Sequence, residues 1–120
     1  MEKAMRKNFS APDEVRKFEK GKLELVDIDG KIVGLFTFQP GWRWSKHVKP
    51  LANTQWCEAP HFQYLISGRL HIMMSDGSEF DMEPGDVVNL PSGHDAWVVG
   101  DEPAIGIDWQ GAVDYAKGSA

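Results

Sequence analysis

The most informative part of the sequence is the stretch Gly85-Asp86-Val87-Val88-Asn89-Leu90-Pro91-Ser92-Gly93-His94. Two turn signals, Pro84-Gly85 and Pro91-Ser92-Gly93, enclose a short and mostly apolar run, and a histidine follows the second turn. A short run between clusters of turn residues is typical of a β-strand. The pattern therefore predicts that one strand turns directly into the next here, with His94 at the start of the second strand.

The same punctuation continues through most of the chain. Asp29-Gly30 and Asp76-Gly77 are hairpin-turn signals with strand-length runs on either side. Short strands at regular intervals predict an all-β sandwich or barrel. Two segments need separate expectations. Ser10-Ala11-Pro12-Asp13 resembles a helix start and predicts a short helix over Pro12 to Phe18, whereas Trp42 to Val48 is expected to form a strand.

From Leu35 to Trp109 the chain resembles the cupins, a superfamily of small jelly-roll barrels. The stretch that ends in His94 resembles their second motif, in which a Pro-x-Gly turn precedes a metal-ligating histidine. A likeness to an uncharacterised bacterial cupin subfamily is carried by Gly41-Trp42-Arg43-Trp44-Ser45, His47-Val48-Lys49-Pro50, Cys57 to His61, Leu65-Ile66-Ser67-Gly68-Arg69 and Gly93 to Pro103. The resemblance implies an all-β cupin jelly-roll barrel and leaves the chemistry open, because one fold hosts many functions.

The chain departs from the first cupin motif, which supplies two histidines and a glutamate. Read forward from Gly41, the motif places His47 at its first histidine and Lys49 at its second. Read backward from Gly68, it places Cys57 at the second histidine and His61 at the glutamate. The loop from residue 50 to residue 60 leaves both readings open. In the second motif Ala96 stands where the histidine is expected and His94 comes two residues earlier, on the same side of an extended strand.

The length of 120 residues and the hydrophobic content of 42% predict one packed domain. We expect an N-terminal arm or short helix over residues 1–20, a barrel over residues 21–112 and a C-terminal tail over residues 113–120. The net charge of −5 argues against nucleic acid as a partner, and no apolar run is long enough for a membrane span. A cytoplasmic protein is the expectation. Sheet edges and apolar strand surface that need covering predict a homodimer.

Cys57, His61 and His94, with His47 as a fourth, are the candidate metal ligands. A thiolate with imidazoles is a typical zinc set, and soft sulfur favours zinc over magnesium or calcium. The alternative is that His61 and His94 are polar pocket residues and that Cys57 is a small buried hydrophobic residue. As the only cysteine of the chain, Cys57 forms no intrachain disulfide.

Four further residues are candidates for binding a small molecule. Gln63 lies two positions after His61 on the same expected strand and therefore shares its face. Trp44 and Trp97 are candidate cavity walls, and Arg43 is a candidate partner for an anionic ligand. Gln63 could instead be a polar residue at the mouth of the barrel. Either tryptophan could belong to the core or an interface, and Arg43 could be a solvated surface residue.

Two functions follow from the candidate site. The first is a cupin barrel that binds a small molecule, with or without a transition metal. The second is a small metal-dependent enzyme of the isomerase, dioxygenase or decarboxylase type. The missing glutamate and the displaced histidine favour the binding protein. Asp95 could orient His94 or stabilise its turn, and His71, with no candidate ligand beside it, is expected to be structural or on the surface.

Overall fold

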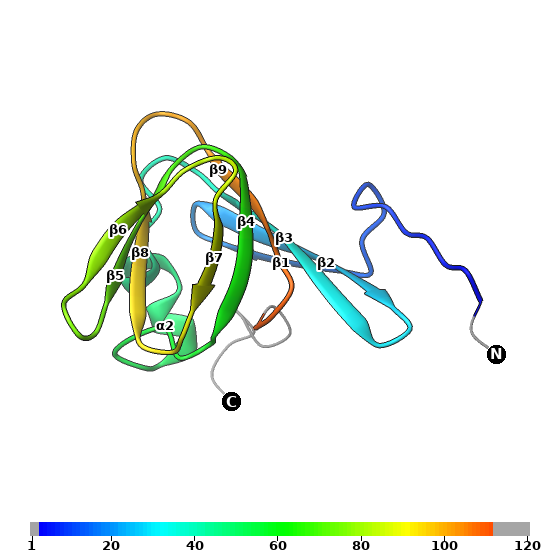
Figure 1. Ribbon diagram of the computed structural model, residues 1–120, viewed down its shortest axis with the longest axis horizontal. Helices are drawn as coiled ribbons and strands as arrows, with labels where there is room; N and C mark the ends of the chain where they lie inside the picture. Colours follow the sequence, from blue (N-terminus) through cyan, green and yellow to red (C-terminus); the bar gives the residue numbers. More distant parts are fainter. Residues whose placement is uncertain (1–2, 112–120) are drawn as a thin grey trace.

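The structure is a computed structural model that describes residues 3–111. Within these residues the chain forms nine strands and two short helices (Figure 1). The strands are β1 (Glu14–Phe18), β2 (Gly21–Ile28), β3 (Lys31–Phe38), β4 (His61–Ser67), β5 (Leu70–Met74), β6 (Glu79–Met82), β7 (Val87–Leu90), β8 (His94–Val98) and β9 (Ala104–Asp108). The helices are α1 (Trp44–His47) and α2 (Lys49–Ala52).

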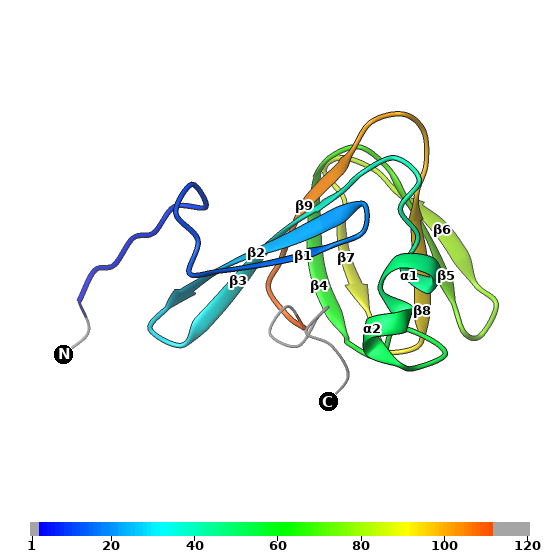
Figure 2. The same cartoon turned by 180° about the vertical axis from the view of Figure 1, so that it is seen from behind.

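The strands form two antiparallel sheets, as a jelly roll requires. The larger sheet has the order β1-β2-β3-β9-β4-β7, and the smaller has the order β6-β5-β8. Strands that are distant in sequence become neighbours, since β9 lies between β3 and β4 and β8 pairs with β5. The sheets face each other across the core (Figures 1 and 2). The predicted all-β cupin jelly-roll architecture is therefore confirmed.

The pleat of the strands decides which side chains reach the interior. In β4 the buried residues His61, Gln63 and Leu65 alternate with the exposed residues Phe62, Tyr64 and Ile66. His61 and Gln63 thus share the inner face, as their spacing predicts. Large apolar side chains complete the core, among them Leu23, Phe36, Phe38, Trp42, Trp44, Leu65, Leu70, Ile72 and Met82.

The helix expected over Pro12 to Phe18 is wrong. Glu14–Phe18 form β1, which pairs with β2 along its whole length. The Asp13 carboxylate accepts the backbone N–H of Asp27 at 2.7 Å, on the neighbouring strand, so it does not cap a helix. Pairing with a long strand has overridden a four-residue capping pattern. The residues before β1 instead form an arm that runs away from the sheets (Figures 1 and 2).

The strand expected over Trp42 to Val48 is also wrong. Only Arg43 makes a β-bridge, to Trp97, and the chain then forms α1 and α2. A buried carboxylate from β8 explains the change, since Asp95 accepts the Ser45 N–H at 3.0 Å and holds the start of α1 against that strand. Trp44 is therefore the first residue of a helix and not part of a strand.

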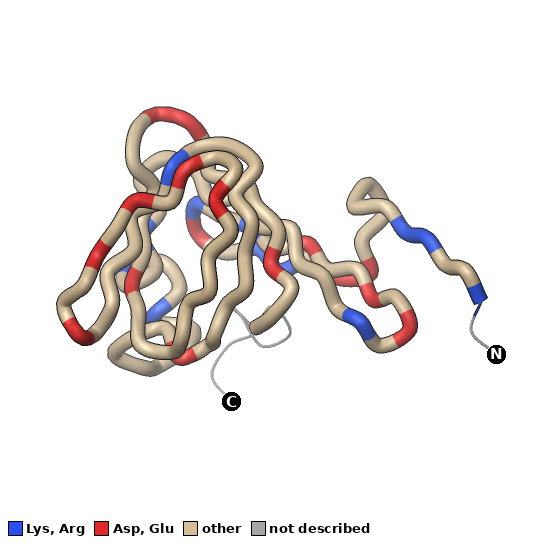
Figure 3. Tube along the Cα trace, viewed as in Figure 1, with Lys and Arg blue, Asp and Glu red and all other residues tan. Residues whose placement is uncertain are grey.

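Acidic and basic side chains are interspersed over the barrel, and the start of the arm is basic (Figure 3). The described residues contain no helix that is long and apolar enough to cross a bilayer. The tail predicted for residues 113–120, and residue 112 at the predicted end of the barrel, lie outside the described part of the chain.

Candidate metal centre

Three side chains from separate parts of the chain converge inside the barrel. One ligand atom each of Cys57, His61 and His94 lies within 4.8 Å of the other two, and all three residues are buried. Cys57 Sγ is 3.6 Å from His61 Nε2, and the two imidazole rings lie 5.1 Å apart between centroids. Among the described residues, this is the group of histidine, cysteine and acidic side chains whose geometry suits a metal ion.

Backbone pairing brings Cys57 next to His94. The Cys57 N–H donates to the His94 carbonyl at 2.8 Å, and the Gly93 N–H donates to the Cys57 carbonyl at 2.8 Å. Gly93 has a φ of 92°, a left-handed conformation that glycine adopts without strain. The turn of the Pro91-x-Gly93 motif therefore both starts β8 and provides the backbone that holds Cys57.

Each imidazole is oriented by a hydrogen bond from its outer nitrogen. His61 Nδ1 lies 2.6 Å from Asp108 Oδ2, and His94 Nδ1 lies 3.0 Å from the Pro91 carbonyl oxygen. A carbonyl only accepts, so His94 Nδ1 carries the proton of this bond, and Nε2 is the nitrogen left for a metal. A hydrogen bond of this kind behind the ring is the usual support of metal-binding histidines.

The three groups also shift one another's protonation. Burial alone would raise the pKa of the Cys57 thiol, but hydrogen bonds with His61 and His94 outweigh it and lower that pKa to about 7. Burial would lower the pKa of His61, yet hydrogen bonds with Asp108 and Cys57 raise it to about 9. Near neutral pH a thiolate is therefore available, and a metal that binds displaces the His61 proton.

The group lies in a cavity of about 30 Å³. Its polar end consists of Cys57, His61, Gln63, His94 and Asp108, and its other walls are apolar and largely aromatic. A single buried water needs about 10–15 Å³, so this cavity holds only a few non-hydrogen atoms. The site accordingly suits an ion with a very small ligand.

Two of the predicted ligand-binding residues line this cavity and two do not. Gln63 and Trp44 are in its wall. Arg43 lies outside, with its guanidinium 4.2 Å from the centre of the Trp97 ring and its Nε donating to Asp95 at 3.1 Å. Trp97 supports that arginine and is no cavity wall. Asp95 holds Arg43 and the start of α1.

His47, the fourth predicted ligand, lies apart from the other three. Its Nδ1 accepts the Arg43 N–H at 3.0 Å, and its Nε2 is 3.9 Å from Glu19 Oε2. It belongs neither to the group of ligand atoms nor to the cavity wall. A role for His47 at this centre gains no support from the geometry.

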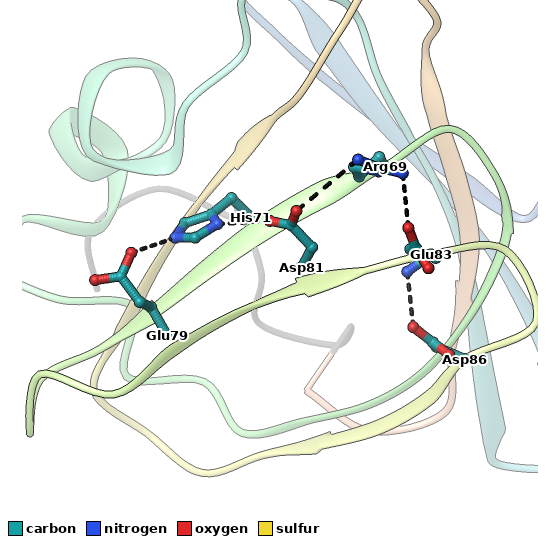
Figure 4. Close-up of polar contacts among 6 residues, drawn as sticks. All are labelled: Arg69, His71, Glu79, Asp81, Glu83 and Asp86. Atoms are coloured by element: carbon teal, nitrogen blue, oxygen red, sulfur yellow. Dashed lines mark hydrogen bonds and ion pairs between the residues drawn. The ribbon is translucent and has the colours of Figure 1, made fainter.

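His71 lies on the outer side of the small sheet, as its sequence context predicts. Its ring nitrogens lie 2.6 Å from Asp81 Oδ1 and 2.7 Å from Glu79 Oε1 (Figure 4). Arg69 extends this network by its contacts with Asp81 and Glu83. The network joins β5 to β6 and is separate from the metal centre.

Sequence reasoning missed two residues of the site, Asp108 and Trp42. Asp108 directly follows the apolar run Ala104-Ile105-Gly106-Ile107 and lies on the buried face of that strand. A carboxylate at a buried position of an apolar strand is the signal that could have identified it. Trp42 was one of five tryptophans with no distinguishing pattern. Its place in the cavity wall depends on the break in extended structure after Arg43.

No protein-family model matches the chain, and neither does any curated protein. Solved structures do. The oxalate decarboxylase–formate complex of Lactobacillus farciminis is 22% identical over 79% of this chain, with a TM-score of 0.59. An S161A mutant of the Bacillus subtilis oxalate decarboxylase is 28% identical over 86% of this chain, with a TM-score of 0.59. The chain spans 30% and 29% of the lengths of these two proteins.

The polyketide cyclase RemF of Streptomyces resistomycificus has a size closer to that of this chain. It is 15% identical over 88% of this chain and 78% of its own length, with a TM-score of 0.63. At that identity the likeness is one of fold. The neighbours therefore agree with the two-sheet architecture, and the chemistry of this chain has to be argued from its own residues.

Proposed function

Because this chain is a member of the cupin superfamily, we propose that its barrel binds a small molecule together with a transition metal held by Cys57, His61 and His94. One observation carries the proposal: the three ligand atoms lie within 4.8 Å of one another at the polar end of a buried cavity. The hydrogen bonds behind both imidazoles support it, because they fix each ring with a nitrogen available to the metal.

Zinc is the metal that suits this donor set best. Tetrahedral zinc with ordinary bond lengths to sulfur and nitrogen separates those two atoms by about 3.6 Å. Cys57 Sγ and His61 Nε2 are 3.6 Å apart. A thiolate with two neutral imidazoles also leaves a net positive charge on a divalent ion, which favours binding of a further anionic or polar group.

The three side chains leave one position of a tetrahedral ion for a ligand from solution. Structural zinc sites have four protein ligands, whereas sites that act on small molecules keep a position open. When bound, the metal would polarise an oxygen of that ligand. The residues of the chain bind the metal, orient the ligand through Gln63 and exclude water with the aromatic walls.

The alternative is a small metal-dependent enzyme of the isomerase, dioxygenase or decarboxylase type. The open position on the metal supports this alternative. So does the fold shared with the Bacillus subtilis oxalate decarboxylase, which is 28% identical to this chain in the matched region. One feature favours binding over catalysis. Asp108, the carboxylate among the described cavity residues, is already hydrogen-bonded to His61 and is no free general base.

A zinc titration tests the proposal with a matched pair of histidine variants. The parent protein is expected to bind one zinc per chain. His61→Ala removes a ligand and should weaken zinc binding by more than the 10- to 100-fold that loss of an outer partner causes. His71→Ala removes a histidine from the outer surface and should leave the affinity unchanged. Equal affinities for the parent and His61→Ala would end the proposal.

We further propose that two copies of this chain, in the cytoplasm, cover each other's large sheet. Across that sheet the outward residues Leu35, Ile107, Tyr64 and Val87 lie opposite one another in register. Tyr64 and Val87 are 38% and 60% exposed. Exposed neighbours enlarge the patch, namely Phe62, Ile66 and Trp109. Monomeric proteins seldom expose a continuous apolar surface of this kind, and twofold dimers are the commonest way to cover one.

A further inference from the structure

One buried hydrogen-bond donor in the cavity wall has no acceptor. Trp42 is 2% exposed and lines the same cavity as the metal ligands. Its indole Nε1 has no hydrogen-bond partner among the described residues. Buried polar atoms are almost always paired in folded proteins. An unpaired donor in the wall of a cavity therefore points to an acceptor that the chain itself does not supply.

The Trp42 ring cannot easily turn to find another partner. It stacks on Phe38 with ring centroids 3.8 Å apart and planes at 5°. The backbone is fixed on both sides, since the Trp42 N–H donates to the Gln39 carbonyl at 3.0 Å and the Val98 N–H donates to the Trp42 carbonyl at 3.0 Å. The indole ring, and with it the N–H group, is thus held in one orientation.

Among the described residues of the cavity wall, no acceptor lies within hydrogen-bond distance of this donor. Asp108 Oδ2 already lies 2.6 Å from His61 Nδ1 and 3.4 Å from Gln63 Nε2, and Oδ1 accepts the Gln110 N–H at 2.9 Å. Most of the remaining wall is apolar. An acceptor for Trp42 has to enter with whatever occupies the cavity.

His47 Nε2 is a second buried nitrogen without a hydrogen bond, but its surroundings differ from those of Trp42 Nε1. It lies outside the cavity wall, and the exposed carboxylate of Glu19 is only 3.9 Å away. A small movement of that side chain would pair it. Of these two nitrogens, only Trp42 Nε1 indicates a ligand in the cavity.

We propose that the ligand of this cavity is a small carboxylate that accepts a hydrogen bond from Trp42 Nε1. An indole N–H only donates, so the group facing it has to be an acceptor, which excludes ammonium compounds. A carboxylate has a second oxygen, and on the proposed function that oxygen takes the open position of the metal. The size of the cavity limits the ligand to a few heavy atoms.

The indole N–H signals of the zinc-loaded protein, recorded by NMR, test this inference. Acetate, and formate as a smaller carboxylate, are titrated in separately, with methylammonium as the cationic control. The Trp42 signal, identified by its loss in Trp42→Phe, is expected to shift downfield and saturate with a carboxylate and to stay in place with methylammonium. Trp42→Phe should weaken carboxylate binding roughly tenfold. Trp109→Phe, on the exposed outer face, should leave it unchanged.

The outcomes separate this inference from the proposed function. Zinc binding is measured independently and is expected to be the same in Trp42→Phe and the parent, because Trp42 is no metal ligand. If zinc binds but neither carboxylate moves the Trp42 signal, the inference is overturned and the metal site stands. If zinc does not bind and a carboxylate still moves the signal, the metal site falls. Should Trp42→Phe fail to fold, variants of the other four tryptophans assign the signal by elimination.

Discussion

His61 Nδ1 lies 2.6 Å from Asp108 Oδ2, although 47 positions separate the two residues in the sequence. The contact exists because β4 and β9 are neighbours in the large sheet, with Gln63 directly opposite Asp108. The carboxylate holds the imidazole so that its other nitrogen lies 3.6 Å from Cys57 Sγ. The orientation of a proposed metal ligand thus depends on a strand that contributes no ligand of its own.

Replacing Asp108 should therefore impair metal binding without removing a ligand. Asp108→Asn is expected to lower zinc affinity by 10- to 100-fold, because the amide is a weaker acceptor for His61 Nδ1–H and no longer raises the basicity of the ring. Competition with a coloured chelator measures the affinity. Asp81→Asn changes the carboxylate behind the exposed His71 and serves as the control. Unchanged zinc affinity in Asp108→Asn would show that the contact does not support the site.

Gly111 should be sensitive to substitution because of its neighbours. A Cβ atom there would collide with the Pro60 carbonyl and lie 3.2 Å from His61 Nδ1. Gly111→Ala is expected to displace His61 and weaken zinc binding, in addition to about 1–2 kcal/mol of strain from its left-handed backbone. Gly77→Ala carries the same backbone strain with open space around the new methyl group. It should lose stability and keep its zinc affinity.

The surface network around His71 predicts a dependence of stability on pH. Hydrogen bonds with Asp81, and then with Glu79, raise the pKa of His71 above its ordinary value of 6.5. A raised pKa in the folded state adds stability below the unfolded value of 6.5, and this contribution disappears as the pH rises through the folded pKa. The free energy of unfolding of the parent minus that of His71→Gln should therefore be larger at about pH 6 than at about pH 9.

That difference should also shrink in high salt, because the charges are close to solvent. A difference that stays constant across this pH range would mean that His71 does not gain a proton from folding. The pKa of the ring can be followed separately by NMR.

The proposed dimer makes a prediction about the outer face of the large sheet. Val87→Lys places a charge in the apolar patch, on the edge strand β7 and opposite Tyr64. Light scattering should give twice the chain mass for the parent and the mass of a single chain for this variant. Phe80→Lys adds the same charge at an exposed aromatic residue of the small sheet and should leave the dimer intact. A parent protein of single-chain mass at micromolar concentration would contradict the dimer.

The turns and the alternation of buried and exposed residues are local features, and they predicted the fold. Pro91-x-Gly93 places His94 at the start of a strand, and the period of two places His61 and Gln63 on one face. What the sequence did not reveal depends on contacts between distant segments. The short helices after Arg43 form where the carboxylate of Asp95, from β8, binds the backbone of α1.

The candidate metal centre also depends on contacts between segments that are distant in the sequence. The loop that contains Cys57 makes a β-bridge to His94, at the start of β8. Asp108 contacts His61 because β9 pairs with β4. Neither contact leaves a pattern in the local sequence. His47 illustrates the converse error. It fits a position of the first cupin motif, but its ring accepts a hydrogen bond from the Arg43 N–H. It lies apart from the candidate metal ligands Cys57, His61 and His94.

Elemental analysis of the full chain shows whether Cys57, His61 and His94 hold a transition metal. The protein is purified without a nickel column or chelators and measured alongside Cys57→Ser. We expect close to one zinc per chain in the parent and a clear loss of zinc in the variant, with both proteins folded by circular dichroism. A folded parent protein that contains no metal and takes up none from a zinc solution would refute the proposed metal site.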